Sequence, residues 1–251
     1  MRDVIAPVPD PRQTAHWGFW GTLIWGMVIS FVFVLLQTIT ITTVLMARDR
    51  HLSPAEFREM FISAAANGYF LSLATFVTTI VCTGLVLGII KLKQGSVLKE
   101  YLCIRPVSLK TMLRWCAYLA AFIALADMLA LALNRPVVTE FMSSVYATAD
   151  PLWMLWVALI FAAPLFEEIF FRGFLFQGIA SGFPGPTGAV FVTAGLWALI
   201  HTQYDAYDRI IIFCLGLLLG AARLRTGSLL TPLALHVVTN LEATLEAAMF
   251  G

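Results

Sequence analysis

Two adjacent carboxylates, Glu167 and Glu168, lie inside an apolar segment that otherwise has the composition of a membrane helix. Arg172 follows Glu168 by four residues, so a helix would let these two side chains meet as an ion pair. Glu167 points about 100° away from Glu168 and gains no such partner from its own helix. A carboxylate without an ion-pair partner in a low dielectric is suited to act as a general base or acid. We therefore expect Glu167 to react and the other two residues to support it.

Two of the four histidines, His201 and His236, also lie within apolar segments. Trp197 precedes His201 by one helical turn, and Asn240 follows His236 by one turn. An asparagine has little reason to face lipid, so the face that carries His236 and Asn240 should look into a helix bundle. Carboxylates, imidazoles and an amide on three separate apolar segments indicate one shared site for proton transfer or metal chemistry.

A purely structural interpretation of these residues is also open. A buried network of ion pairs and hydrogen bonds could order the helices without reacting, and a lone histidine near a helix end is often no more than a satisfied polar group. The common signatures of other enzymes are absent from the sequence. It has no HExxH helix of the zinc proteases, no GxSxG serine elbow and no GxxxxGK[ST] nucleotide loop.

The composition is that of a membrane protein. The chain has 251 residues, of which 60% are hydrophobic and only 12% are charged, and its mean hydropathy is +0.85. Soluble domains carry about twice that charged fraction. The net charge of +1 gives no argument for a nucleic-acid partner. The sequence therefore predicts an all-α, polytopic transmembrane bundle.

Seven apolar segments are candidates for membrane spans, or eight if the first one is split. The segments are Trp20–Leu45, Tyr69–Ile90, Met112–Leu133, Leu152–Gln177, Gly188–Thr202, Ile210–Ala222 and Leu229–Met249. The proline-containing residues 1–16 are expected to be a loose tail, and residues 17–251 a single transmembrane domain.

The distribution of basic residues predicts the orientation in the membrane. Lysine and arginine are concentrated in residues 91–114, between the second and third spans, whereas the Asn134–Asp150 loop carries only Arg135. Because cytoplasmic loops are enriched in basic residues, we expect a cytoplasmic N-terminus and an external C-terminus. A short chain with few loop residues fits the plasma (inner) membrane of a bacterium.

Taken together, Glu167-Glu168-x-x-x-Arg172, Trp197-x-x-x-His201 and His236-x-x-x-Asn240 resemble three motifs of a known family. It is the CAAX protease and bacteriocin-processing (CPBP, or Abi) family, which includes the type II CAAX prenyl endopeptidases. The resemblance covers about residues 151–249, the expected catalytic core. The first three spans match only as hydrophobic helices, and Trp197 stands where the family often has phenylalanine.

The resemblance implies an intramembrane endopeptidase that acts on a peptide or protein, either lipidated or bacteriocin-like. In the family's glutamate-type mechanism, Glu167 and His201 would activate a water that attacks the scissile carbonyl. His236 and Asn240 would form the oxyanion hole, and the predicted ion pair would orient the site. Neutral donors in a low dielectric stabilise such an oxyanion well.

Two alternatives stay open. Glu167, His201 and His236 could instead bind zinc, with water in the fourth position, as in metalloproteases. We favour a site without metal, because Asn240 is a poor zinc ligand and a good oxyanion donor. The chain could also be a non-enzymatic membrane immunity or scaffold protein. That alternative predicts that Glu167→Gln hardly changes function.

Overall fold

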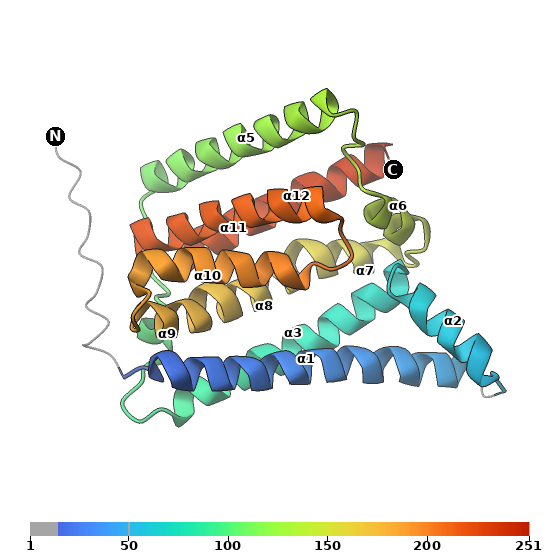
Figure 1. Cartoon of the computed structure of the whole chain (residues 1–251), viewed down its shortest axis with the longest axis horizontal. Coiled ribbons are helices and arrows are strands. Elements are labelled where there is room, and N and C mark those ends of the chain that lie inside the picture. The colour runs from blue at the N-terminus through green and yellow to red at the C-terminus, as the bar shows by residue number, and fades with distance from the viewer. Residues whose placement is uncertain (1–14, 50, 251) are drawn as a thin grey trace.

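The computed structural model describes residues 15–49 and 51–250, and these form helices and loops with no strand. Figure 1 shows long helices that lie side by side, with their axes roughly along one direction. The predicted all-helical class is therefore confirmed. The tail predicted for residues 1–16 falls almost entirely outside the described residues.

Each of the seven apolar segments forms a helix or a set of consecutive helices. They are α1 (Gly18–Arg48), α3 (Gly68–Leu92), α5 (Leu109–Ala132), the run from α7 to α9 (Leu152–Ala180), α10 (Gly185–Ile200), α11 (Ala206–Thr226) and α12 (Leu230–Phe250). The first four are long and apolar enough to cross a membrane. The last three are shorter or more polar, so the predicted number of spans stays a prediction. Helix α1 is continuous rather than split.

Local capping residues set several helix boundaries. Ser53 and Glu56 form a reciprocal capping box at the start of α2 (Pro54–Ala64). The side chain of Asn67 caps α3, and that of Asp205 caps α11. Gly227 ends α11 in the left-handed region, with φ of 63°. These signals extend α11 well beyond its apolar core, which is why it is longer than the predicted segment Ile210–Ala222.

The run from α7 to α9 occupies the middle of the bundle. It packs against α1 and α3 on one side and against α10 and α12 on the other. Phe174 and Ile179 on this run are completely buried, and Trp197 on α10 is almost completely buried. Helix α5 lies at the edge of the bundle against α11 and α12, with only Leu119 and Ala130 buried. The motif-bearing segments therefore form the best-packed part of the molecule.

Two π-helical segments interrupt this central run. They are η2 (Ala158–Ala162) and η3 (Glu168–Leu175). After η2, the amide of Ala163 donates to the carbonyl of Ala158 instead of to that of Leu159. After η3, the amide of Phe176 donates to the carbonyl of Phe171. Segments of this kind are rare and are frequently found at functional sites.

The basic loop and the α11–α12 turn meet at one end of the bundle. The amide of Leu229 donates to the carbonyl of Cys103 at 3.0 Å, and the Ser228 hydroxyl donates to the carbonyl of Arg105. The short helix α4 (Leu98–Tyr101) belongs to the same loop, whereas α6 (Glu140–Ala147) lies at the other end. The basic residues of the 91–114 loop and those in the last turn of α11, Arg223 and Arg225, therefore lie at the same end of the bundle, in agreement with the predicted orientation.

Candidate active site

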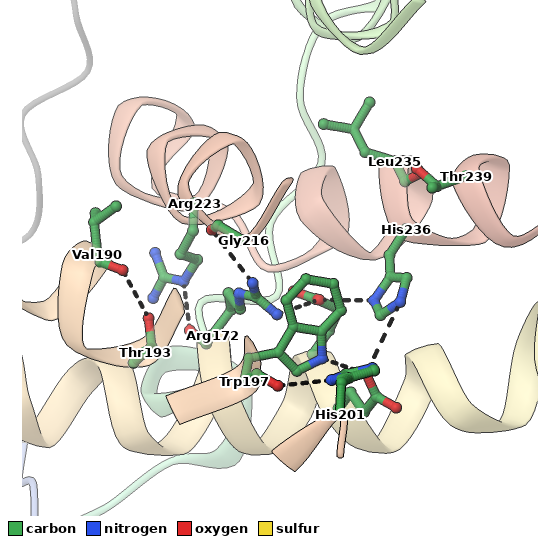
Figure 2. A network of polar contacts seen from close by, with 12 residues as sticks. Arg172, Val190, Thr193, Trp197, His201, Gly216, Arg223, Leu235, His236 and Thr239 are labelled. Carbon is green, nitrogen blue, oxygen red and sulfur yellow. Dashed lines mark hydrogen bonds and ion pairs between the residues drawn. The ribbon is translucent and has the colours of Figure 1, made fainter. Parts of the chain in front are cut away.

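The predicted ion pair is present and completely buried. Arg172 Nη1 donates to Glu168 Oε1 at 2.8 Å, and both side chains have 0% exposure. His236, on α12, brings its Nδ1 to 2.9 Å from the same carboxylate oxygen. An ionised carboxylate can only accept, so Nδ1 carries the hydrogen in this bond. The first and third motifs therefore meet directly at Glu168, as Figure 2 shows for Arg172 and His236.

Arg172 is held by further contacts from α10 and α11. Its Nη2 donates to the carbonyl of Gly216 at 3.3 Å, and its guanidinium carbon lies 4.7 Å from the centre of the Trp197 ring. A Cβ atom on Gly216 would lie 3.0 Å from Ala194 Cβ, so a glycine lets α11 approach α10 closely. This close approach brings a carbonyl acceptor to the buried guanidinium.

Glu167 has a different environment from its neighbour. Its Oε2 accepts a hydrogen bond from Trp197 Nε1 at 2.5 Å and lies 3.9 Å from His236 Nε2. Its side chain is 20% exposed, whereas that of Glu168 is completely buried. The partners of Glu167 come from α10 and α12, in agreement with the expectation that its own helix offers none.

His201 joins the cluster through the second motif. It follows the last residue of α10 with φ of −81° and ψ of 55°, and its Nδ1 lies 2.6 Å from the carbonyl oxygen of Trp197. The ring centroids of the two residues are 5.0 Å apart. Trp197 thus links His201 to Glu167, since its backbone contacts one and its indole N–H the other (Figure 2).

Asn240 lies one turn beyond His236 and bonds to the motif-bearing span at a different point. Its Nδ2 donates to the carbonyl of Leu159 in η2 at 2.8 Å. That carbonyl lacks its usual donor because the Ala163 amide bonds to Ala158, and Pro164, the next position, has no N–H. Asn240 therefore has a structural task, and the second hydrogen of its amide is left for another acceptor.

The predicted zinc ligands do not meet the geometry of a ready-made metal site. Across residues 15–49 and 51–250, the ligand atoms of Glu167, His201 and His236 do not gather within 4.8 Å of one another. Three carboxylates elsewhere do so, and each of them is half-buried. They are Asp127 on α5 together with Glu242 and Glu246 on α12. The sequence gives no signal for this group, because Asp127 is far from the two glutamates in the chain and the three residues form no recognisable motif.

One cavity of the structure lies away from the motif residues. It has a volume of about 920 Å³ and is lined by residues of the α5–α6 loop, α6 and the end of α12, among them Glu140, Glu246 and Phe250.

Comparisons with known proteins single out the same region. Residues 149–241 match the family model of the type II CAAX prenyl endopeptidase Rce1-like proteins, a region that holds all three motifs. An uncharacterized 24.3 kDa protein of Escherichia coli is 34% identical over 98 residues, which are 38% of this chain and 43% of that protein. The chain therefore spans less than half of that relative. No solved structure matches. The family match confirms the resemblance predicted from the motifs.

Proposed function

We propose that this protein is an intramembrane endopeptidase of the glutamate type. The family match supports a CAAX-protease-like membrane endopeptidase. The proposal rests mainly on one observation, the joining of the three motifs around Trp197 and Glu168 in a single buried network. Residues from α8 (Ala163–Glu167), η3, α12 and the end of α10 thereby provide two carboxylates, two imidazoles and an indole N–H at one point of the bundle.

Glu167 is the proposed general base. It is the more exposed of the two carboxylates, and its partner Trp197 is a neutral donor that orients it without removing its charge. The Nδ1 of His201 bonds to the backbone carbonyl of Trp197. This bond fixes the ring and leaves Nε2 to bind the water that Glu167 would activate. A carboxylate and an imidazole that share a water are a common arrangement for activating it.

His236 and Asn240 are the proposed oxyanion donors. His236 donates Nδ1–H to Glu168, and its Nε2 lies on the side of Glu167, 3.9 Å from Oε2, where a hydrogen on this nitrogen would donate to the oxyanion. Asn240 would contribute the second hydrogen of an amide that is already oriented by Leu159. Donors fixed before the reaction stabilise a developing oxyanion without reorganisation.

The proposed substrate is a peptide or protein, with lipidated and bacteriocin-like peptides as the two classes to test. The proposed location is the inner membrane of a bacterium, supported by the similarity to an Escherichia coli protein. Paired peptides that differ only by a farnesyl group on a C-terminal CAAX sequence would reveal whether prenylation is required.

The decisive variant is Glu167→Gln, measured in detergent or proteoliposomes with such peptides. Glutamine keeps the size and an acceptor for Trp197, but it cannot take up a proton. We expect kcat to fall by about 10²–10⁴ while the thermal midpoint stays unchanged. Glu246→Gln, at a half-buried carboxylate outside the network, is the control. Equal cleavage by Glu167→Gln, or no cleavage by the wild type, would favour the membrane scaffold or immunity alternative.

Zinc remains the competing mechanism, with Glu167, His201 and His236 as ligands. We propose that no tightly bound metal is required. Prolonged chelation should leave cleavage intact, whereas a zinc enzyme would lose activity and regain it with added zinc. Purified protein whose activity tracks one equivalent of zinc would replace the glutamate mechanism and leave the endopeptidase proposal standing.

A further inference from the structure

Arg223, on α11, is a second buried arginine that the proposed chemistry does not use. Its side chain is 3% exposed, although it lies in the last turn of α11. Arginines near helix ends usually extend towards the membrane interface. Arg223 instead points into the bundle, where its Nε donates to the carbonyl of Arg172 at 3.0 Å and its guanidinium carbon lies 5.2 Å from the Phe176 ring. Figure 2 shows the hydrogen bond from Arg223 to the carbonyl of Arg172.

The carbonyl that Arg223 contacts is available because of the π-helical segment. In an α-helix the amide of Phe176 would donate to the carbonyl of Arg172. In η3 that amide bonds to Phe171 instead. A buried carbonyl without a donor is costly, so Arg223 supplies the bond that the change of register removes.

Helix α11 thereby holds Arg172 at both ends. The carbonyl of Gly216 accepts from its guanidinium, and Arg223 donates to its backbone. If η3 slipped towards the α-helical register, the residues on its two sides would turn by about 100° relative to each other. Glu167 and Glu168 would then no longer face Trp197 and His236.

We infer that Arg223 is a positioning residue of the active site, which holds η3 in the register that directs Glu167 and Glu168 towards their partners. The inference rests on the proposed endopeptidase function. It assigns Arg223 no contact with the substrate. Its effect on the reaction passes through the backbone of Arg172.

The test compares Arg223→Met, which removes the donor and keeps much of the volume, with Arg225→Met. Arg225 is an exposed arginine on the same helix and serves as the control. In Arg223→Met we expect amide hydrogen exchange in residues 168–180 to rise by about tenfold. We also expect kcat for the farnesylated peptide to fall by about 10- to 100-fold with KM unchanged. Arg225→Met should change neither.

Arg223→Lys provides the conservative variant and keeps a cationic donor. We expect it to restore part of kcat and of the exchange protection, and to keep the inference testable if Arg223→Met does not fold. Unchanged exchange in 168–180, or raised exchange with a normal kcat, would overturn the inference. A wild-type protein that cleaves neither peptide would contradict only the proposed function. The exchange measurement would then decide on its own whether Arg223 holds η3.

Discussion

Glu167 and Glu168 are neighbours in sequence, yet they lie on two sides of the site with opposite properties. On the Glu168 side, the carboxylate bonds to a guanidinium and an imidazole, and no part of it reaches solvent. On the Glu167 side, the partner is the neutral indole N–H of Trp197, and a fifth of the side chain is exposed. The strongest interactions are thus assigned to the residue that we expect not to react.

The difference indicates that the two neighbouring carboxylates have separate roles, one in stability and one in the reaction. Buried charges that form an ion pair hold the segments together, because leaving either one unpaired is expensive. A carboxylate that keeps its charge and some access to water can bind and activate a nucleophile. Variants on the Glu168 side should therefore reduce stability, and variants on the Glu167 side should reduce turnover.

The largest effect is expected from Arg172→Ala, which leaves Glu168 buried without its cation. We predict a loss of about 3–5 kcal/mol in the free energy of unfolding and a lower yield of folded protein. The double variant Glu168→Gln/Arg172→Met removes both charges and should recover part of that loss. A thermal midpoint for Arg172→Ala equal to that of the wild type would contradict the assignment of the Glu168 side.

Asn240→Ala separates the two tasks that we assign to this amide. If the amide donates to the oxyanion, kcat should fall by about 10²–10³ with little change in KM. If its bond to Leu159 were its whole role, the variant would lose stability by about 1–3 kcal/mol and turn over normally. Parallel measurements of kcat and of the unfolding midpoint distinguish these results.

Trp197→Phe should have a smaller effect on the Glu167 side. The phenyl ring can keep contact with the Arg172 guanidinium, but it cannot donate to Glu167. Hydrogen bonds to charged groups contribute about 1.5–3 kcal/mol, so we predict a fall in kcat of about 10- to 100-fold. A variant with a normal kcat would mean that the indole bond does not orient the base.

The smallest effect is expected from Arg135→Ala. Arg135 pairs with Asp205 at the other end of the helices, where both side chains are partly exposed. Exposed pairs contribute little because water and salt screen them. The unfolding midpoint and kcat should both stay at wild-type values. A marked loss of either would show that this end of the helices is coupled to the active site.

Much of this arrangement could be predicted from regular spacing. The four-residue interval predicted the Glu168–Arg172 pair, and runs of apolar residues predicted all seven long helical segments. The one-turn spacing of His236 and Asn240 correctly placed both on a face that packs inside the bundle. Spacing is informative here because the α-helix repeats its neighbours at fixed intervals.

The π-helical segments and their side-chain donors could not be predicted in this way. No composition distinguishes η3 from an α-helix, although Pro164 is a hint for η2, because it cannot donate to a preceding carbonyl. Charge statistics alone place Arg223 among the basic residues of the cytoplasmic end. Its burial follows from the contact between α11 and η3, which depends on tertiary packing.

The central position of Trp197 has a consequence for how mutational effects combine. Its ring or backbone contacts Glu167, Arg172, His201 and His236, so the motifs share one side chain. Changes at residues that share a partner are not independent, and their free energies do not add. Once one motif is disabled, a second substitution should cost little more. Double-mutant cycles across the motifs should therefore yield large coupling energies. For the same reason, a homologue that retained only two of the three motifs would gain little from those two.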